Sequence, residues 1–220
     1  MLEKSEGLWS APTPAKLTAT RYKKLTLEQE EGPIAKTYRQ PKFISGGGGR
    51  LTPAERGTAM HLVMQLIPPH KAAEADTAAE FIGSLVAKKI LSPSAAAELD
   101  PSRVSAFFTS EVGREMIEYL PSARREFRFT LPLAADRWTG GKGELLLQGV
   151  VDLFWEDAEG RISVVDYKTD RIRPGYELER AESYRPQLEV YADALEKIVG
   201  KPIKASYIYF FETGRTVKVL

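Results

Sequence analysis

The chain contains no cysteine among its 220 residues and only two histidines. Without thiols, the sequence excludes disulfides, thiolate catalysis, zinc fingers and iron–sulfur clusters, and it is compatible with a reducing cytoplasmic setting. It also lacks an apolar run of membrane-spanning length and a secretory signal. We therefore expect a cytoplasmic protein with no membrane attachment.

An excess of charge of one sign is also missing, because 31 lysines and arginines balance 30 aspartates and glutamates to give a net charge of +1. Any nucleic acid must therefore be bound locally and not over the whole surface. The chain has no G-x-x-x-x-G-K-[ST] loop and so carries no ATP motor of its own. Basic positions that could line one groove are Arg21, Lys23, Lys24, Arg124, Arg125, Arg128, Arg171, Arg173 and Arg185.

The order of sequence patterns predicts the fold class. Residues 1–50 are mixed and polar and end in a run of four glycines, which is typical of a linker or N-terminal extension. From residue 51 the patterns predict a helical region to about Leu120, then three or more strands, a helix near Tyr184 and a last strand pair. This order predicts an α/β fold with a mixed central sheet flanked by helices and preceded by a helical region.

The most informative segment covers residues 148–169, QGVVDLFWEDAEGRISVVDYKT. Two runs rich in branched and aromatic residues flank the turn signal DAEGR, and this pattern predicts a β-hairpin. The turn fits a three-residue loop in which Gly160 adopts the left-handed conformation, so that Asp157 faces Arg161.

The loop fixes the register of the hairpin so that Asp152 faces Asp166, with Lys168 on the same side. Two opposed carboxylates about 5 Å apart repel each other unless a cation lies between them, and Mg²⁺ accepts both carboxylate and phosphate oxygens. A nearby lysine can stabilise developing charge or help to deprotonate an attacking water. The alternative is a plain salt bridge on an exposed face. Along residues 150–155 the side chains alternate between the two faces of the strand, and both faces are apolar. This pattern favours a central strand that is covered on both sides.

The run LTPAERGTAMHLVMQLI predicts a helix that begins with a capping box from Thr52 to Glu55. Gly57 and His61 lie four residues apart and share one stripe of this helix, where the glycine lets another group come close. A lone histidine in a helix is more often structural than a ligand. On spacing alone, both roles of His61 stay open.

The run YRPQLEVYADALEKIVGKP predicts a second helix, stopped by Gly200. Gln187 and Tyr191 lie on or beside its apolar stripe. Ordinary packing is the alternative to a role in orienting the lysine or in contacting a nucleic acid strand. Glu126 could extend a metal site, but three arginines surround it in RREFRF, so we expect it in a surface ion pair.

Four separated runs, GTAMH, QGVVD, DYKTD and YRPQLEVY, occur in an order that resembles the RecB-like branch of the PD-(D/E)xK nucleases. The resemblance covers about residues 51–220 and is closest to the C-terminal nuclease domain of AddA-type helicase–nuclease proteins. It implies a restriction-endonuclease-like core. It also implies that the metal ligands are His61, Asp152, Asp166 and the main-chain carbonyl of Tyr167, and that the catalytic residues are Asp152, Asp166 and Lys168. Gln187 and Tyr191 match the Q-x-x-x-Y motif of the family.

The resemblance also implies a function. We expect a Mg²⁺-dependent DNA exonuclease, with Mn²⁺ as a substitute, that cuts single-stranded DNA unwound by a helicase region of the same parent chain. A role in double-strand break repair and recombination is implied as well, together with an AddB-type partner subunit. Arg171 and Arg185 flank the metal motif and are expected to bind DNA. Two alternatives stay open: a free-standing RecB-like nuclease, and a catalytically silent nuclease fold that binds strands or docks partner proteins.

Overall fold

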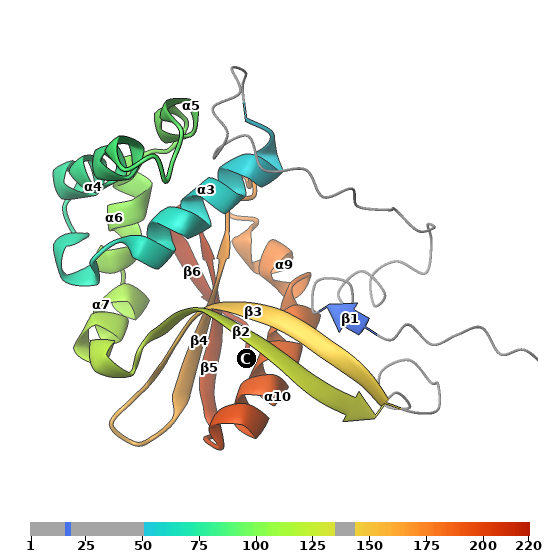
Figure 1. Cartoon of the computed structure of the whole chain (residues 1–220). Helices are drawn as coiled ribbons and strands as arrows, with labels where there is room; N and C mark the ends of the chain where they lie inside the picture. The colour runs from blue at the N-terminus through green and yellow to red at the C-terminus, as the bar shows by residue number, and fades with distance from the viewer. Residues whose placement is uncertain (1–15, 19–50, 135–143) are drawn as a thin grey trace, which may run out of the picture.

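The computed structural model describes residues 16–18, 51–134 and 144–220. The run of glycines at 46–49 and the basic positions Arg21, Lys23 and Lys24 lie outside these residues. The elements in chain order are β1 (Lys16–Thr18), α3 (Pro53–Leu66), α4 (Ala75–Ala87), α5 (Pro93–Ala97), α6 (Pro101–Thr109), α7 (Glu111–Glu118), β2 (Arg124–Ala134), β3 (Glu144–Glu156), β4 (Ile162–Lys168), α9 (Glu177–Glu182), α10 (Arg185–Val199), β5 (Ile203–Phe210) and β6 (Arg215–Lys218) (Figure 1).

The sheet is built around the long strand β3. One edge of β3 pairs antiparallel with β2 along most of its length. The other edge pairs in parallel with β1 at residues 146–148 and antiparallel with β4 at residues 153–156. β4 then runs parallel to β5, and β5 antiparallel to β6. The sheet is therefore mixed, and the predicted α/β class is confirmed.

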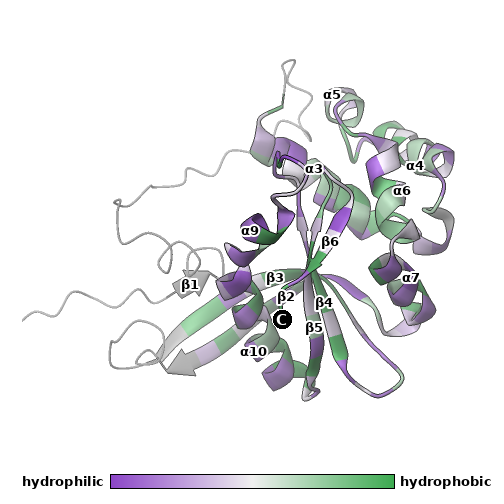
Figure 2. Cartoon of the chain, turned by 180° about the vertical axis from the view of Figure 1, so that it is seen from behind, coloured by the Kyte–Doolittle hydropathy of each residue, from purple (hydrophilic) through white to green (hydrophobic). Residues whose placement is uncertain are grey.

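Helices cover both faces of this sheet. The helical region α3 to α7 packs on one face, in a cluster that includes Trp155 and Tyr167. α10 packs on the other face against Phe154, Val164 and Ile208. Figure 2 shows hydrophobic residues along the strands and hydrophilic ones on the outer sides of α9 and α10. The burial of both faces explains why β3 and β4 are apolar at nearly every position.

The helix α3 begins as its sequence predicts. The main-chain N–H of Glu55 donates to Oγ1 of Thr52 at 3.2 Å, and the N–H of Thr52 donates to the Glu55 carboxylate at 2.9 Å, which completes the capping box. At the other end, Arg125 donates to the carbonyl oxygens of Met64 and Ile67 at 3.0 and 2.6 Å. The expectation that Arg125 lines a groove is therefore wrong, because its guanidinium satisfies carbonyls that the helix leaves unpaired.

Two described elements have no counterpart in the expectations from sequence. β1 lies inside the segment interpreted as a linker or extension, and it pairs three of its residues with β3. α9 is only six residues long and follows β4 through an irregular segment. The boundary at residue 50 stays a prediction. No helix among residues 51–134 and 144–220 has the length and apolar character needed to cross a membrane.

Candidate metal centre

The hairpin loop that aligns β3 with β4 has the predicted form. The N–H of Asp157 donates to the carbonyl of Arg161 at 2.9 Å, and Gly160 has a φ of +75°. Oδ1 of Asp157 accepts from the N–H groups of Glu159 and Arg161 at 3.1 and 2.9 Å, and Oδ2 pairs with the guanidinium of Arg161 at 2.8 Å. Burial raises the pKa of Asp157, but these bonds, together with Lys204, bring it well below its usual range.

One step beyond the last pair, Leu153 with Val165, the predicted register would place Asp152 opposite Asp166, but this pair is not part of the ladder. The ladder ends at this step. Oδ2 of Asp152 instead accepts the main-chain N–H of Tyr167 at 2.7 Å. The N–H of Tyr167 therefore bonds to a side-chain carboxylate of β3 and not to a main-chain carbonyl. This bond fixes the position of the Asp152 side chain.

The strand β3 changes its packing at Asp152. Val151 packs in the cluster beneath α10, whereas Leu153 packs in the cluster beneath α3 to α7, although residues two apart in a regular strand share a face. The expected simple alternation over residues 150–155 is therefore wrong. The neighbouring strand is irregular at the matching position, because Glu126 has a φ of +52° and the pairs on either side of it oppose Leu153 and Val151.

Three side chains from three elements meet at this irregularity. Nδ1 of His61, on α3, lies 3.2 Å from Oδ1 of Asp152 and 3.6 Å from Oε1 of Glu126. One ligand atom from each of the three residues lies within 4.8 Å of the others. The expectation that Glu126 forms a surface pair with its neighbouring arginines is therefore wrong, because its left-handed backbone brings its carboxylate close to His61.

The charges of this group favour a cation at its centre. Burial lowers the pKa of His61, but the carboxylates of Asp152, Glu126 and Asp166 outweigh burial and raise it to about 10. In the absence of another cation, the proton on the imidazole supplies the positive charge between the carboxylates. Imidazole and carboxylate are also metal ligands, and metal binding displaces such protons. A divalent metal ion therefore fits this group.

A second group lies beside the first and holds Lys168. The Lys168 ammonium forms an ion pair with the buried carboxylate of Asp166 and donates to Oε1 of Gln187 at 3.3 Å. Nε2 of Gln187 donates to Oδ1 of Asp166 at 3.1 Å and to the hydroxyl of Tyr191 at 2.8 Å. Burial raises the pKa of Asp166, and Lys168 opposes that effect. Gln187 thus bridges the carboxylate and the lysine.

Tyr191, the tyrosine of the Q-x-x-x-Y motif, supports the side chain of Gln187. Tyr191 is 4% exposed, and its ring meets that of Phe129 edge to face at 6.1 Å. The ring therefore packs in the protein core, and the hydroxyl holds Gln187 in position. This burial does not favour stacking against a nucleic acid strand.

Sequence reasoning missed a cluster that closes over Lys168 from the side of α9. The Lys168 ammonium lies 4.3 Å from the centre of the Tyr184 ring. The Tyr184 hydroxyl donates to Asp170, and Arg180 donates to that hydroxyl at 3.1 Å and to Asp170 at 2.8 Å. Burial, followed by Asp170, raises the pKa of Tyr184, so the hydroxyl stays protonated. Asp170 is the last residue of DYKTD and Tyr184 the first of YRPQLEVY, so these two motifs could have indicated the cluster.

The remaining site candidates lie at the rim. Arg171 is exposed beside two surface hollows, and Arg185 is half-buried and pairs with Glu182 at 2.7 and 2.8 Å. Gly57 lets α3 approach the segment after Lys168, because a Cβ added there would lie 2.9 Å from Oγ1 of Thr169. The close approach expected at this glycine is therefore present.

Comparison with known proteins gives the family. A family model described as the PD-(D/E)XK nuclease superfamily matches residues 35–218. An ATP-dependent helicase/nuclease subunit from Desulforamulus reducens is 34% identical over 218 residues, which cover 94% of this chain and 17% of that protein. The protein of the same name from Bacillus cereus strain AH820 is 38% identical over 192 residues, covering 82% of this chain and 15% of that protein.

The chain spans 15–17% of the length of these curated relatives. The resemblance that the four sequence motifs indicated is confirmed. Because the family model covers most of the chain, including every residue of the site, the chain belongs to the PD-(D/E)XK nuclease superfamily.

Proposed function

We propose that the chain is a Mg²⁺-dependent deoxyribonuclease that hydrolyses phosphodiester bonds of single-stranded DNA, with Mn²⁺ as a possible substitute. One observation carries the proposal: a cluster of metal-ligand type, formed by His61, Glu126 and Asp152, lies beside a buried pair of Asp166 and Lys168. These residues come from α3, β2, β3 and β4. A purely structural salt bridge would not require four elements to converge.

The proposed metal ligands are His61, Asp152, Asp166 and the main-chain carbonyl of Tyr167, and Glu126 is an additional candidate. Their chemistry supports this assignment, since one imidazole and several oxygen donors suit Mg²⁺ or Mn²⁺ better than a soft metal. When bound, such an ion would stabilise charge on the phosphate oxygens and favour deprotonation of water.

Lys168 is proposed as the catalytic lysine. It is partly exposed, with 15% of its side-chain surface accessible, so its ammonium can reach a phosphate while it stays paired with Asp166. An ammonium there can stabilise charge that develops on the reacting phosphate or exchange a proton with the attacking water. Gln187 keeps the ammonium and Asp166 in a fixed relation through its amide.

The biological setting is proposed from the relatives. Their names describe a helicase/nuclease subunit, and this chain matches a small part of their length. We propose that the substrate strand is produced by a helicase region of the same parent chain, in double-strand break repair and recombination in the cytoplasm. An AddB-type subunit is the proposed partner, and Arg171 and Arg185 are proposed to contact the DNA.

The test is digestion of end-labelled single- and double-stranded oligonucleotides with Mg²⁺, with Mn²⁺ and with EDTA. We expect cleavage of the single strand with either metal and none with EDTA. Lys168→Ala should reduce the cleavage rate by roughly 10²- to 10⁴-fold, as is usual for loss of an acid–base group. Lys88→Ala is the matched control, because Lys88 is an exposed lysine at the end of α4.

Near-normal turnover of Lys168→Ala would end the proposed role of this residue. A wild-type chain that binds the strand but never cuts it with any divalent metal would favour the catalytically silent module.

A further inference from the structure

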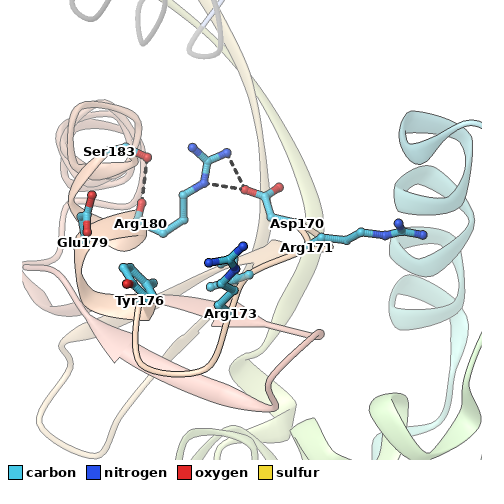
Figure 3. Close-up of a pocket in the computed structure, with 8 residues that line it drawn as sticks. Asp170, Arg171, Arg173, Tyr176, Glu179, Arg180 and Ser183 are labelled. Atoms are coloured by element: carbon cyan, nitrogen blue, oxygen red, sulfur yellow. Dashed lines mark hydrogen bonds and ion pairs between the residues drawn. The ribbon is translucent and has the colours of Figure 1, made fainter.

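A solvent-open hollow of about 680 Å³ lies between the segment that follows β4 and the helix α9 (Figure 3). We call it the arginine hollow. Its charged and aromatic lining consists of Asp170, Arg171, Arg173, Tyr176, Glu179 and Arg180. The first of these residues comes two positions after Lys168, so the hollow begins where the proposed catalytic strand ends.

The arginine hollow has three arginines against the carboxylates of Asp170 and Glu179, an excess of one positive charge that favours an anion. Arg180 is neutralised, because its guanidinium pairs with Asp170. Arg171 and Arg173 are exposed, and neither forms a side-chain ion pair with any residue of the ranges that the structure describes. In Figure 3, Arg173 lies near Tyr176 while Arg171 points away from both. Guanidinium groups of this kind bind phosphate in a bidentate manner.

The hollow also offers an aromatic surface. Tyr176 is 57% exposed, and the turn that carries it is firmly held. Its N–H donates to the carbonyl of Arg173 at 3.2 Å, and the N–H of Gly175 donates to the carboxylate of the buried Glu177 at 2.8 Å. Gly175 has a φ of +96°, which glycine adopts without strain. The fold thus fixes the backbone that presents a ring to solvent, as in proteins that stack bases on aromatic side chains.

The hollow is adjacent to Lys168. Asp170, in its lining, accepts the hydroxyl hydrogen of Tyr184, and the ring of Tyr184 lies 4.3 Å from the Lys168 ammonium. A single side chain therefore separates the hollow from the lysine.

We propose that the arginine hollow binds the nucleotide next to the cleaved phosphodiester, with its phosphate on Arg173 and its base stacked on Tyr176. The inference rests on the proposed function, because it assumes that the substrate is a single strand. Stacking and phosphate contact read no base edge, so binding is independent of sequence.

The experiment measures binding of the whole chain to a fluorescent oligothymidylate in EDTA, where the strand is not cut, at several salt concentrations. Arg173→Ala should weaken binding about tenfold and lower the salt slope by about one. Tyr176→Ala and Tyr176→Leu should each weaken binding about tenfold, while Tyr176→Phe should stay within about twofold. Lys88→Ala, which removes an exposed positive charge from the helical region, should change neither quantity. Thermal melting of each variant checks that it is folded.

A second readout reports stacking directly. A 2-aminopurine placed at successive positions of the strand should be quenched on binding at one or more positions, and Tyr176→Leu should abolish part of that quenching while Tyr176→Phe keeps it. Unchanged affinity and unchanged quenching in Tyr176→Leu and Arg173→Ala overturn the proposal, and so does a wild-type chain that does not bind the strand.

The outcomes also separate the hollow from the nuclease. If binding depends on the Tyr176 ring and on Arg173 but the wild-type chain cuts no strand with Mg²⁺, the proposal for the hollow is supported and the nuclease proposal fails. If the wild-type chain cuts with Mg²⁺ and all the variants of the hollow bind and cut as the wild type does, the nuclease proposal is supported and the proposal for the hollow fails.

Discussion

The ammonium of Lys168 is held from three directions by side chains of different kinds. Asp166 pairs with it, the amide oxygen of Gln187 accepts from it, and the ring of Tyr184 covers it at 4.3 Å. The ring is fixed in turn by Asp170 and Arg180, which hold its hydroxyl. We therefore infer that Tyr184 positions the proposed catalytic Lys168.

We predict that Tyr184→Leu lowers the single-turnover cleavage rate by roughly 3- to 30-fold. This factor corresponds to the free energy of a partly desolvated cation–π contact. Tyr184→Phe keeps the ring and should retain more of the rate than Tyr184→Leu. Rapid-quench measurement with Mg²⁺ gives the rates, and strand binding in EDTA should change little in either variant. Equal rates in wild type and Tyr184→Leu would refute the positioning role.

The sequence predicted part of this arrangement of side chains. Asp152, Asp166 and Lys168 were expected on one side of the hairpin, because pairing in a sheet has a period of two and the loop sets its origin, although the ladder ends before Asp152. The role of Glu126 did not follow. Its position depends on a φ of +52°, which a non-glycine residue adopts only in a specific tertiary context, and adjacent arginines suggested a simpler partner.

The β3–β4 hairpin depends on one carboxylate at its loop. Asp157 accepts two main-chain N–H groups and pairs with Arg161 and Lys204, and its side chain is 1% exposed. We predict that Asp157→Ala lowers the free energy of unfolding by about 2–3 kcal/mol, because charged hydrogen bonds are lost. Asp157→Asn keeps an amide oxygen for the N–H groups and should cost about 1 kcal/mol. Urea unfolding at neutral pH measures both.

This contribution should depend on pH with a defined sign. The pKa of Asp157 is lower in the folded chain than its unfolded value of about 3.9. The stabilisation is therefore fully present above pH of about 4 and is lost as the pH falls through the folded pKa. The difference between wild type and Asp157→Asn should shrink in acid. A constant difference from pH 7 to pH 3 would contradict this account.

The packing of β2, β3 and α10 depends on a glycine in the QGVVD motif. Gly149 pairs with Phe129 across the strands, and a Cβ added at Gly149 would lie 2.5 Å from two ring carbons of Phe129 and 3.3 Å from the ring of Tyr191. Phe129 is buried and cannot move away freely. We predict that Gly149→Ala destabilises the chain by about 1–3 kcal/mol through overpacking.

The matched control for Gly149→Ala is Gly83→Ala, because a Cβ added at Gly83 in α4 meets nothing within 4 Å. Replacing a helical glycine by alanine should stabilise the chain by about 0.5–1 kcal/mol. Thermal melting of the two variants should therefore shift in opposite directions. A loss of stability in both would point to a cause other than the Phe129 contact.

Most elements followed from the sequence because each carries a local signal. Thr52, Ser92 and Asp100 cap helices that start with proline, and Gly200 ends α10 with a φ of +74°. β1 and α9 lack such signals. Their three and six residues are too few for a period to be recognised, and the pairing of β1 with β3 is a long-range contact that local patterns do not record.

Across the whole molecule, the site lies where the two layers of helices meet the irregular part of the sheet. His61 comes from α3 on one face and Gln187 from α10 on the other, while β3 and β4 pass between them. The proposed metal ligands His61 and Asp166, the latter bonded to Gln187, therefore come together only when both layers are packed. Binding of an ion to the folded chain should then be linked to its global stability.

We predict that Mg²⁺ or Mn²⁺ raises the melting temperature of the chain. A ligand present at 100 times its dissociation constant stabilises a protein by about 2.7 kcal/mol, which corresponds to a rise of roughly 5–10 °C for a chain of this size. Thermal melts over a metal titration, compared with EDTA, measure the effect. The dissociation constant already contains the relief of repulsion between Asp152 and Asp166, which His61 and Lys168 offset in the absence of metal.

The variant Asp152→Asn distinguishes this site from other carboxylates. An asparagine can still accept the N–H of Tyr167, so the strand contact is kept while the ligand charge is removed. We expect the metal-dependent rise to disappear in Asp152→Asn. It should persist in Lys168→Ala, since the lysine is proposed to act on the phosphate or the water and not to hold the ion. The same rise in wild type and Asp152→Asn would mean that the metal binds elsewhere, and the assignment of His61 and Asp152 as ligands would then fail.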